Sequence, residues 1–286
     1  ALKAPLSELR RAAERALRVG PYSVINKTTP SPSGDVHDYH SVGPYWWPDP
    51  KSKDGRPYIY KSRVNPDRKK VGDDYRFKET LSAVTTLALA YWFTGDDRYA
   101  ERAATLIKIW YLDGPTRMNP NLAYAQEIPG RRPGRGVGVI DADGQPNLVD
   151  AVGLLESSEH WTARDQRALV KWFKKFLVWL QTSYNGNEER NHVNNHGIQY
   201  DAQVASYALF VDKPDVAFEV LQAVPTRRIA TQIEPNGSQP LELVRNSSSW
   251  DYSCLSTYRF TEAAALAQNV GLDLWAYETP DGRSIR

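Results

Sequence analysis

The chain has little sulfur, no long apolar run and almost no net charge. Its 286 residues include one methionine and one cysteine, Cys254, so an intramolecular disulfide is excluded and the fold is not a disulfide framework. No apolar stretch approaches the roughly 20 residues of a membrane-spanning helix. Basic and acidic residues nearly balance, 36 against 34. This balance argues against a nucleic-acid partner, because nucleic-acid-binding domains are usually strongly basic.

Aromatic residues, in contrast, are abundant. The chain holds nine Trp and sixteen Tyr, side chains that stack on sugar rings in some proteins and fill large helical cores in others. Composition leaves both uses open. The proportions of hydrophobic and charged residues, 41% and 24%, are those of an ordinary globular protein. A chain of this length can bury one substantial core, and we expect a single domain over residues 1–286.

Apolar residues recur with the period of a helix rather than a strand. Residues 77–91 and 99–110 each carry a stripe at steps of three and four, and the short turn between them predicts an antiparallel pair of helices. Further helices are predicted at 5–19, 163–180, 198–209 and 251–269. The predicted fold class is all-α: an α/α toroid, or incomplete barrel of antiparallel helical hairpins.

Two long irregular segments interrupt the helices. Residues 21–73 are rich in Pro, Gly, Tyr and Trp, and residues 113–146 carry Arg131, Arg132 and Arg135. Loops of this length are uncommon in a compact domain and are usually functional. We expect both segments to lie over the cleft of the toroid.

The densest polar cluster spans residues 191–197, where a helix should begin. His196, Tyr200 and Gln203 follow at helical spacing on the face opposite the apolar stripe. Such a face is either solvated or the wall of a cleft, and the scarcity of Lys and Glu favours the cleft. His192 and His196 stand four residues apart, but the Glu of the zinc-protease motif and a third ligand are missing. We therefore predict no metal site.

A second cluster spans residues 245–252, where serines and Asp251 suit a loop that enters a helix. Tyr252 would lie in the first helical turn, where the helix dipole and the nearby Arg245 favour a phenolate. The alternative for Tyr252 is a buried side chain whose hydroxyl is hydrogen-bonded.

These motifs together resemble the alginate lyases. Asn195 and His196, followed by Arg245 and Tyr252, resemble the catalytic quartet of polysaccharide lyase family five. Segments 38–50, 134–141 and 237–242 resemble the wider superfamily, and within it the family thirty-eight lyases that act on glucuronan and alginate. The resemblance covers nearly the whole chain.

The resemblance implies an α/α toroid and a lyase that needs neither a metal nor another cofactor. The expected substrate is a uronic-acid polymer, either alginate (polymannuronate) or glucuronan, cut by β-elimination to leave 4,5-unsaturated uronate ends. Relatives usually continue with further helices beyond the equivalent of residues 274–277, so the toroid is expected to be less closed. Residues 46–67 differ from the lid of family five, and substrate preference is therefore not carried over. We expect a secreted or periplasmic protein without a membrane span; its oligomeric state is left open.

Each quartet member has an expected role in this chemistry. Asn195 and Arg245 would hydrogen-bond the uronate carboxylate, so that charge developing during removal of H5 is stabilised. Tyr252 would take H5 and return a proton to O4 where both lie on one ring face, as in mannuronate and glucuronate. In guluronate they lie on opposite faces, and His196 would act as the base.

Substrate-binding roles are predicted for a wider set of polar and aromatic residues. Tyr39 and His40 would close over the substrate, whereas Trp46 or Trp47 would either stack on a sugar or pin a loop to the core. The full predicted set is Tyr39, His40, Trp46, Trp47, Tyr124, Gln126, Arg135, His192, Tyr200 and Gln203. Two rival functions remain: a non-catalytic carbohydrate-binding protein, and a glycoside hydrolase, which needs two carboxylates flanking one bond. The candidate carboxylates for a hydrolase are Glu127, Asp141, Asp150, Glu156 and Glu242.

Overall fold

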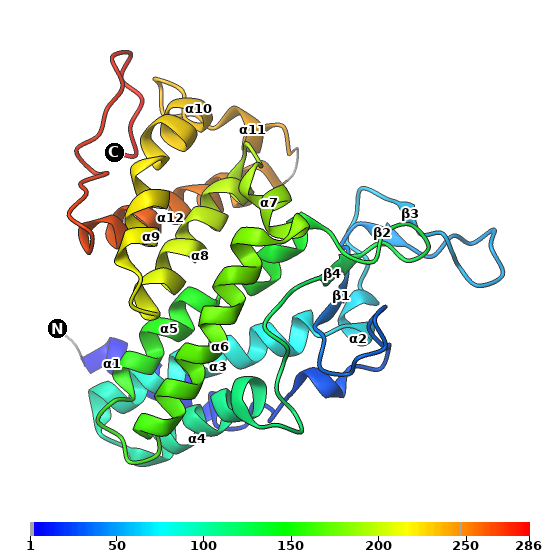
Figure 1. Cartoon of the computed structure of the whole chain (residues 1–286), viewed down its shortest axis with the longest axis vertical. Helices are drawn as coiled ribbons and strands as arrows, with labels where there is room; N and C mark the ends of the chain where they lie inside the picture. Colours follow the sequence, from blue (N-terminus) through cyan, green and yellow to red (C-terminus); the bar gives the residue numbers. More distant parts are fainter. Residues whose placement is uncertain (1–2, 246–247) are drawn as a thin grey trace. The chain divides into compact units, whose positions relative to one another are not determined.

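Helices dominate the chain (Figure 1). The computed structural model describes residues 3–245 and 248–286, so Asn246 and Ser247 of the second polar cluster lie outside the described residues. The chain divides into two compact units, Ala1–Phe176 and Leu177–Arg286. The single-domain organisation expected for residues 1–286 stays a prediction. No described helix is both long and apolar enough to cross a membrane.

The first unit is built on a helical hairpin. Helix α3 (Asp74–Thr94) ends at Gly95, whose left-handed φ of 67° turns the chain, and Asp96 caps the next helix, α4 (Asp97–Ile107), by accepting a hydrogen bond from the Arg98 amide. The hairpin predicted from the two apolar stripes is therefore confirmed. Helix α3 also packs against α1 (Lys3–Ala16) and α5 (Gln145–Leu154).

The core of this unit is rich in aromatic rings. Phe77 stacks on Trp110 with a centroid separation of 4.9 Å, and Tyr39 meets the edge of Phe77 at 5.5 Å. Tyr111 contacts Trp172 of α6 (Ala163–Thr182). These aromatic side chains therefore pack in the core. The remaining helical segments of the unit are η1 (Val24–Asn26), α2 (Arg68–Val71), η2 (Lys108–Leu112) and η3 (Gly136–Ala142).

The two long segments predicted as irregular contain short strands. Strand β1 (His40–Val42) pairs in parallel with β4 (Tyr124–Glu127), which joins one segment to the other. Strands β2 (Trp46–Trp47) and β3 (Ile59–Tyr60) form an antiparallel pair. The expectation of wholly irregular segments was wrong here, because strands of two to four residues are too short to show a period of two.

The second unit surrounds one buried helix. Helix α8 (Asn195–Phe210) packs against α9 (Pro214–Gln222), α12 (Ser249–Gln268) and α7 (Tyr184–Arg190), and α11 (Pro240–Leu243) packs against α12 (Figure 1). Along the chain, η4 (Pro225–Ile229) and α10 (Ala230–Gln232) follow α9 and precede α11. The helices predicted at 198–209 and 251–269 are confirmed, each beginning two or three residues earlier than expected. The face of α8 that carries Tyr200 and Gln203 is buried rather than solvated.

Candidate active site

A buried carboxylate holds the imidazole of His196. Glu189 comes from the last turn of α7, His196 from the first turn of α8, and Nδ1 of His196 lies 2.6 Å from Oε1 of Glu189. The Glu189 side chain is fully buried and that of His196 is 14% exposed. A carboxylate only accepts hydrogen bonds, so Nδ1 carries the proton. This fixes the tautomer and leaves Nε2 of His196 with a lone pair for chemistry.

His192 flanks the same carboxylate more loosely. Its Nε2 lies 3.7 Å from Oε2 of Glu189, and its ring centroid is 5.3 Å from that of His196. Burial lowers the pKa of His192, which outweighs the attraction of Glu189. Within residues 3–245 and 248–286, no group of three or more His, Cys, Asp or Glu side chains is placed to hold a metal ion.

Asn195 is oriented by a second buried carboxylate. Glu242 of α11 accepts hydrogen bonds from the backbone amide of Asn195 at 2.7 Å and from its Nδ2 at 2.8 Å. Both side chains are buried, and Oδ1 of Asn195 has no hydrogen-bond partner in the described part of the chain. The bonds from Asn195 to Glu242 tie the start of α8 to the segment that leads into Arg245.

Arg245 and Tyr252 are in direct contact. The guanidinium carbon of Arg245 lies 3.9 Å from the centroid of the Tyr252 ring, within the range of a cation–π interaction. Tyr252 occupies the first turn of α12, as the serine-rich segment predicted, and both side chains are partly exposed. The four predicted catalytic residues thus belong to one unit, on the starts of α8 and α12 and the segment after α11.

Arg228 holds the turn that carries the histidines. Its Nε and Nη2 bond the carboxylate of Asp201 at 2.6 and 3.2 Å, and its Nη1 and Nη2 donate to the carbonyls of His192 and Arg190 at 2.7 and 2.8 Å. Both members of the ion pair are buried. Burial raises the pKa of Asp201, opposed by Arg228. The Arg228 bonds fix the chain between Glu189 and His196.

Gly197→Ala is expected to destabilise this turn by about 3 kcal/mol, the upper range for overpacking a rigid site. A Cβ at Gly197 would lie 2.2 Å from the His192 carbonyl oxygen and 2.3 Å from Nη1 of Arg228. Gly153→Ala on α5 is the matched control: nothing lies within 4 Å of its Cβ position, so the better helix propensity of Ala should stabilise by about 0.5–1 kcal/mol. Urea unfolding measures both, and similar free energies for the two variants would contradict the close packing of Gly197.

Predicted substrate-binding residues of the first unit gather around Asp141. This buried carboxylate accepts hydrogen bonds from the hydroxyls of Tyr39 and Ser41 and from Nε2 of Gln126. Arg135 in turn donates from Nη2 to Oε1 of Gln126 at 2.6 Å and from Nε to its carbonyl at 3.0 Å. Gln126 itself has a left-handed φ of 51°, a strained conformation for a residue other than glycine.

His40 is also buried in this cluster. Its Nε2 lies 2.6 Å from Oε2 of Glu127, and its Nδ1 is without a partner among the described residues. Burial raises the pKa of the neighbouring Asp73 to about 6, and that carboxylate accepts a hydrogen bond from the His40 amide. Tyr39 and His40 have no exposed surface, which favours a supporting role over direct contact with a sugar.

The remaining predicted residues differ in exposure. Tyr124, Arg135, Trp46 and Trp47 are partly exposed. Tyr200 and Gln203 are buried: the Tyr200 hydroxyl donates to the carbonyl of Leu180, and burial raises its pKa to about 12. These two side chains are placed as core residues of the second unit, although they were predicted to contact the substrate.

Sequence reasoning missed the partners of the catalytic candidates. Glu189 was not singled out. Glu242 was named as a possible hydrolase carboxylate and as part of the family-like segment 237–242, but not as a partner of Asn195. Arg228 and Asp201 carried no signal beyond being charged residues in an apolar context. Glu189 and His196 lie on different helices, α7 and α8, so helical periodicity gave no hint of their contact.

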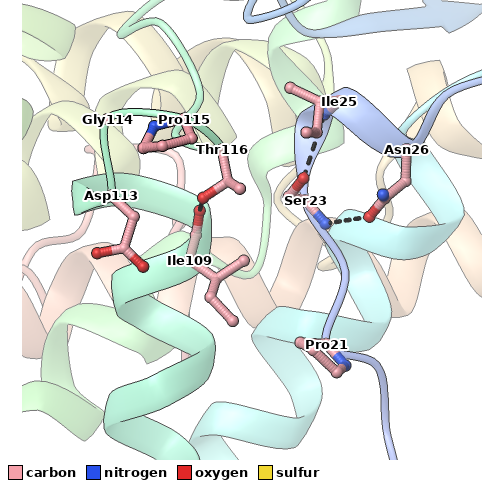
Figure 2. A pocket seen from close by; sticks show the side chains of 9 residues that line it. All are labelled: Pro21, Ser23, Ile25, Asn26, Ile109, Asp113, Gly114, Pro115 and Thr116. Carbon is pink, nitrogen blue, oxygen red and sulfur yellow. Dashed lines mark hydrogen bonds between the residues drawn. The ribbon is translucent and has the colours of Figure 1, made fainter.

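A hollow of the first unit with a volume of about 510 Å³ lies away from these residues (Figure 2). It is lined by Pro21, Ser23, Ile25, Asn26, Ile109, Asp113, Gly114, Pro115 and Thr116. Its Ser23 and Thr116 side chains bond nearby backbone, the hydroxyl of Thr116 donating to the carbonyl of Ile109. None of the predicted site residues lines this hollow.

Comparisons with known proteins agree with this architecture. The sequence profile of the alginate lyase family, described as "Alginate lyase", matches residues 23–286. The crystal structure of an alginate lyase from Bacteroides ovatus is similar with a TM-score of 0.94 and 42% identity, over 99% of this chain and 75% of that one. No curated protein matches the chain significantly.

More distant structures share the fold alone. Two variants of alginate lyase A1-III, one with a histidine replaced by alanine and one with a tyrosine replaced by phenylalanine, were each solved in complex with a tetrasaccharide. Both match with a TM-score of 0.61 and 18% identity, over 98% of this chain and 72% or 73% of theirs. The predicted fold class, an all-α toroid, is confirmed by these likenesses. The chain therefore belongs to the alginate lyase family and is a polysaccharide lyase.

Proposed function

We propose that this enzyme cleaves a uronic-acid polymer of the alginate type by β-elimination, without a metal ion, and leaves 4,5-unsaturated uronate ends. The observation that supports this most is that two pairs of residues occur in one unit. In one pair Glu189 orients the imidazole of His196, and in the other Arg245 contacts the ring of Tyr252. The similar structures are named alginate lyases, and two of them hold a tetrasaccharide.

Neutralisation of the substrate carboxylate is the first requirement. The H5 of a uronate is weakly acidic until charge can spread into a stabilised carboxylate. Arg245 supplies a planar fork of N–H donors, and Asn195 keeps a second amide hydrogen, since Glu242 takes one of the two. Donors fixed before reaction stabilise developing charge at little reorganisation cost. These donors stabilise the substrate carboxylate without a metal ion.

Proton transfer is the second requirement. On mannuronate, Tyr252 removes H5 and returns the proton to the bridging O4, because both lie on the same ring face. The cationic Arg245 against its ring favours negative charge on the phenolic oxygen. On guluronate, Nε2 of His196 takes H5 from the opposite face while Tyr252 protonates O4. Glu189 then stabilises the imidazolium that forms.

The geometry gives less support to the hydrolase alternative. Asp141 and Glu242 are buried and accept two or more hydrogen bonds each, and Glu127 is paired with His40. A hydrolase needs two carboxylates facing one glycosidic bond, and these three are engaged elsewhere. Glucuronan remains a candidate substrate, because glucuronate presents H5 and O4 on one face as mannuronate does.

A substrate panel tests the proposal. Polymannuronate, polyguluronate and glucuronan are each incubated with the enzyme, and the ultraviolet absorbance of the enol ether is followed. We expect absorbance to rise with at least one polymer. New reducing ends without absorbance would indicate a hydrolase, and binding without any product would indicate a carbohydrate-binding protein. Because so large a polyanion does not cross a cytoplasmic membrane unaided, we also propose that the enzyme acts outside the cytoplasm.

A further inference from the structure

The β2–β3 hairpin of the first unit concentrates positive charge. Residues 45–63 contain five basic side chains and two acidic ones, a net charge of +3, whereas the whole chain carries +2. The basic residues are Lys51, Lys53, Arg56, Lys61 and Arg63. The loop between the two strands extends away from the helices of the same unit (Figure 1).

The two acidic residues of the hairpin stabilise its loop. Asp49 accepts a hydrogen bond from the Lys51 amide at 2.9 Å, and Asp54 accepts from the Arg56 amide at 3.0 Å. The bond from Arg56 holds the pKa of Asp54 below its usual range. None of the five basic side chains forms an ion pair with a carboxylate of the described chain. Their charge is therefore not neutralised locally.

The Trp47 ring contacts two of these cations. The Lys61 ammonium and the Arg63 guanidinium each lie 4.8 Å from the centroid of the Trp47 ring, and the indole N–H of Trp47 donates to the Arg63 carbonyl at 3.0 Å. Both are within the distance of a cation–π interaction. The ring of Trp47 is thus already in contact with two cations.

Arg131 joins the same surface from the second long segment. Its guanidinium lies 5.8 Å from the centroid of the Trp46 ring, and its Nε donates to the carbonyl of Tyr58 at 2.9 Å. The Tyr58 amide in turn donates to the Pro129 carbonyl, which ties the two segments together. Arg131 is exposed and, like the hairpin cations, forms no ion pair with a described carboxylate.

We propose that residues 45–63 together with Arg131, here called the basic hairpin, form a contact surface for an anionic polysaccharide, in addition to the residues around His196. Lys61, Arg63 and Arg131 bind carboxylates of the polymer, and Trp46 and Trp47 position these cations. A polyuronate carries one carboxylate on every sugar and so can offer an anion to each of these cations. The inference rests on the proposed substrate class.

Charge reversal tests the basic hairpin. The double variant Lys61→Glu/Arg63→Glu is compared with Lys174→Glu/Lys175→Glu, the same change of charge at exposed lysines of α6. Calorimetry gives dissociation constants for polymannuronate, a mannuronate tetrasaccharide and carboxyl-reduced polymannuronate. We expect the hairpin variant to bind the polymer about tenfold more weakly relative to the tetrasaccharide, with a shallower salt dependence, because exposed charges are screened by salt. The control should change by less than about twofold.

Two results would overturn the proposal. One is a hairpin variant that binds polymannuronate as tightly as the α6 control does. The other is an equal loss for the polymer and its carboxyl-reduced form, which would indicate sugar stacking instead of charge. The variant Lys61→Gln/Arg63→Gln removes the two positive charges without adding negative ones. It is the test to use if the charge-reversed hairpin does not fold. Binding is measured in the Tyr252→Phe background, in which turnover is expected to be slow. A wild-type protein that binds polymannuronate but cleaves no uronan would contradict the proposed function and leave this inference intact.

Discussion

Tyr252→Phe is expected to lower the turnover of polymannuronate by about 10²–10⁴-fold, the usual contribution of a general acid–base group. The change removes one oxygen and keeps the ring on which Arg245 lies at 3.9 Å. Substrate binding and folding should therefore be little affected. Abstraction of H5 and protonation of O4 would both lose the phenolic oxygen that carries the proton. The initial rate of enol-ether absorbance measures the effect.

The same helix offers a matched control. Tyr258 of α12 is 47% exposed and also has an arginine over its ring, Arg259 at 4.8 Å. Tyr258→Phe removes the same atom from a similar arginine–tyrosine contact and should leave the rate within about twofold, as surface substitutions usually do. If Tyr252→Phe retained more than a tenth of the wild-type rate, the base would have to be assigned to another residue.

Helical periodicity predicted much of the fold, and its failures have physical reasons. The α3–α4 hairpin was predictable because its apolar stripes are long and its turn carries Gly95 and Asp96, a C-terminal and an N-terminal capping residue. The β1–β4 pair was not, since hydrogen bonds between residues 40–42 and 124–127 leave no local pattern in so few residues. Short helices such as α11, with four residues, are also too short to show a helical period.

The site was predictable in its reactive groups but not in their support. Asn195, His196, Arg245 and Tyr252 were found through a family resemblance and fall within one unit. Glu242 lies 47 residues from Asn195 in sequence, so only a folded chain reveals that its carboxylate orients that amide. Burial also distinguishes between residues that were all predicted from the sequence to bind substrate. Trp46 remains partly exposed, whereas Tyr39 and His40 have no surface left for a sugar.

Glu189→Gln is expected to be the second most damaging change, and its effect should depend on the polymer. Glutamine can present an N–H to Nδ1 of His196, which would move the ring proton to Nε2, and it lacks the charge that stabilises an imidazolium. We expect a loss of about 10²–10³-fold on polyguluronate, where His196 must take H5. The loss on polymannuronate should be about tenfold or less, since Tyr252 serves there as both base and acid.

This difference between the two polymers separates chemistry from packing. Glu189 is fully buried, so a purely structural effect would lower kcat on both polymers by the same factor and would also lower the melting temperature. Glu219→Gln on α9 neutralises an exposed carboxylate of the same unit and should change neither rate. Equal losses on the two polymers with Glu189→Gln would show that His196 is not a base selective for guluronate. Its imidazole would then serve to neutralise the substrate carboxylate alongside Arg245, a role that both epimers need equally.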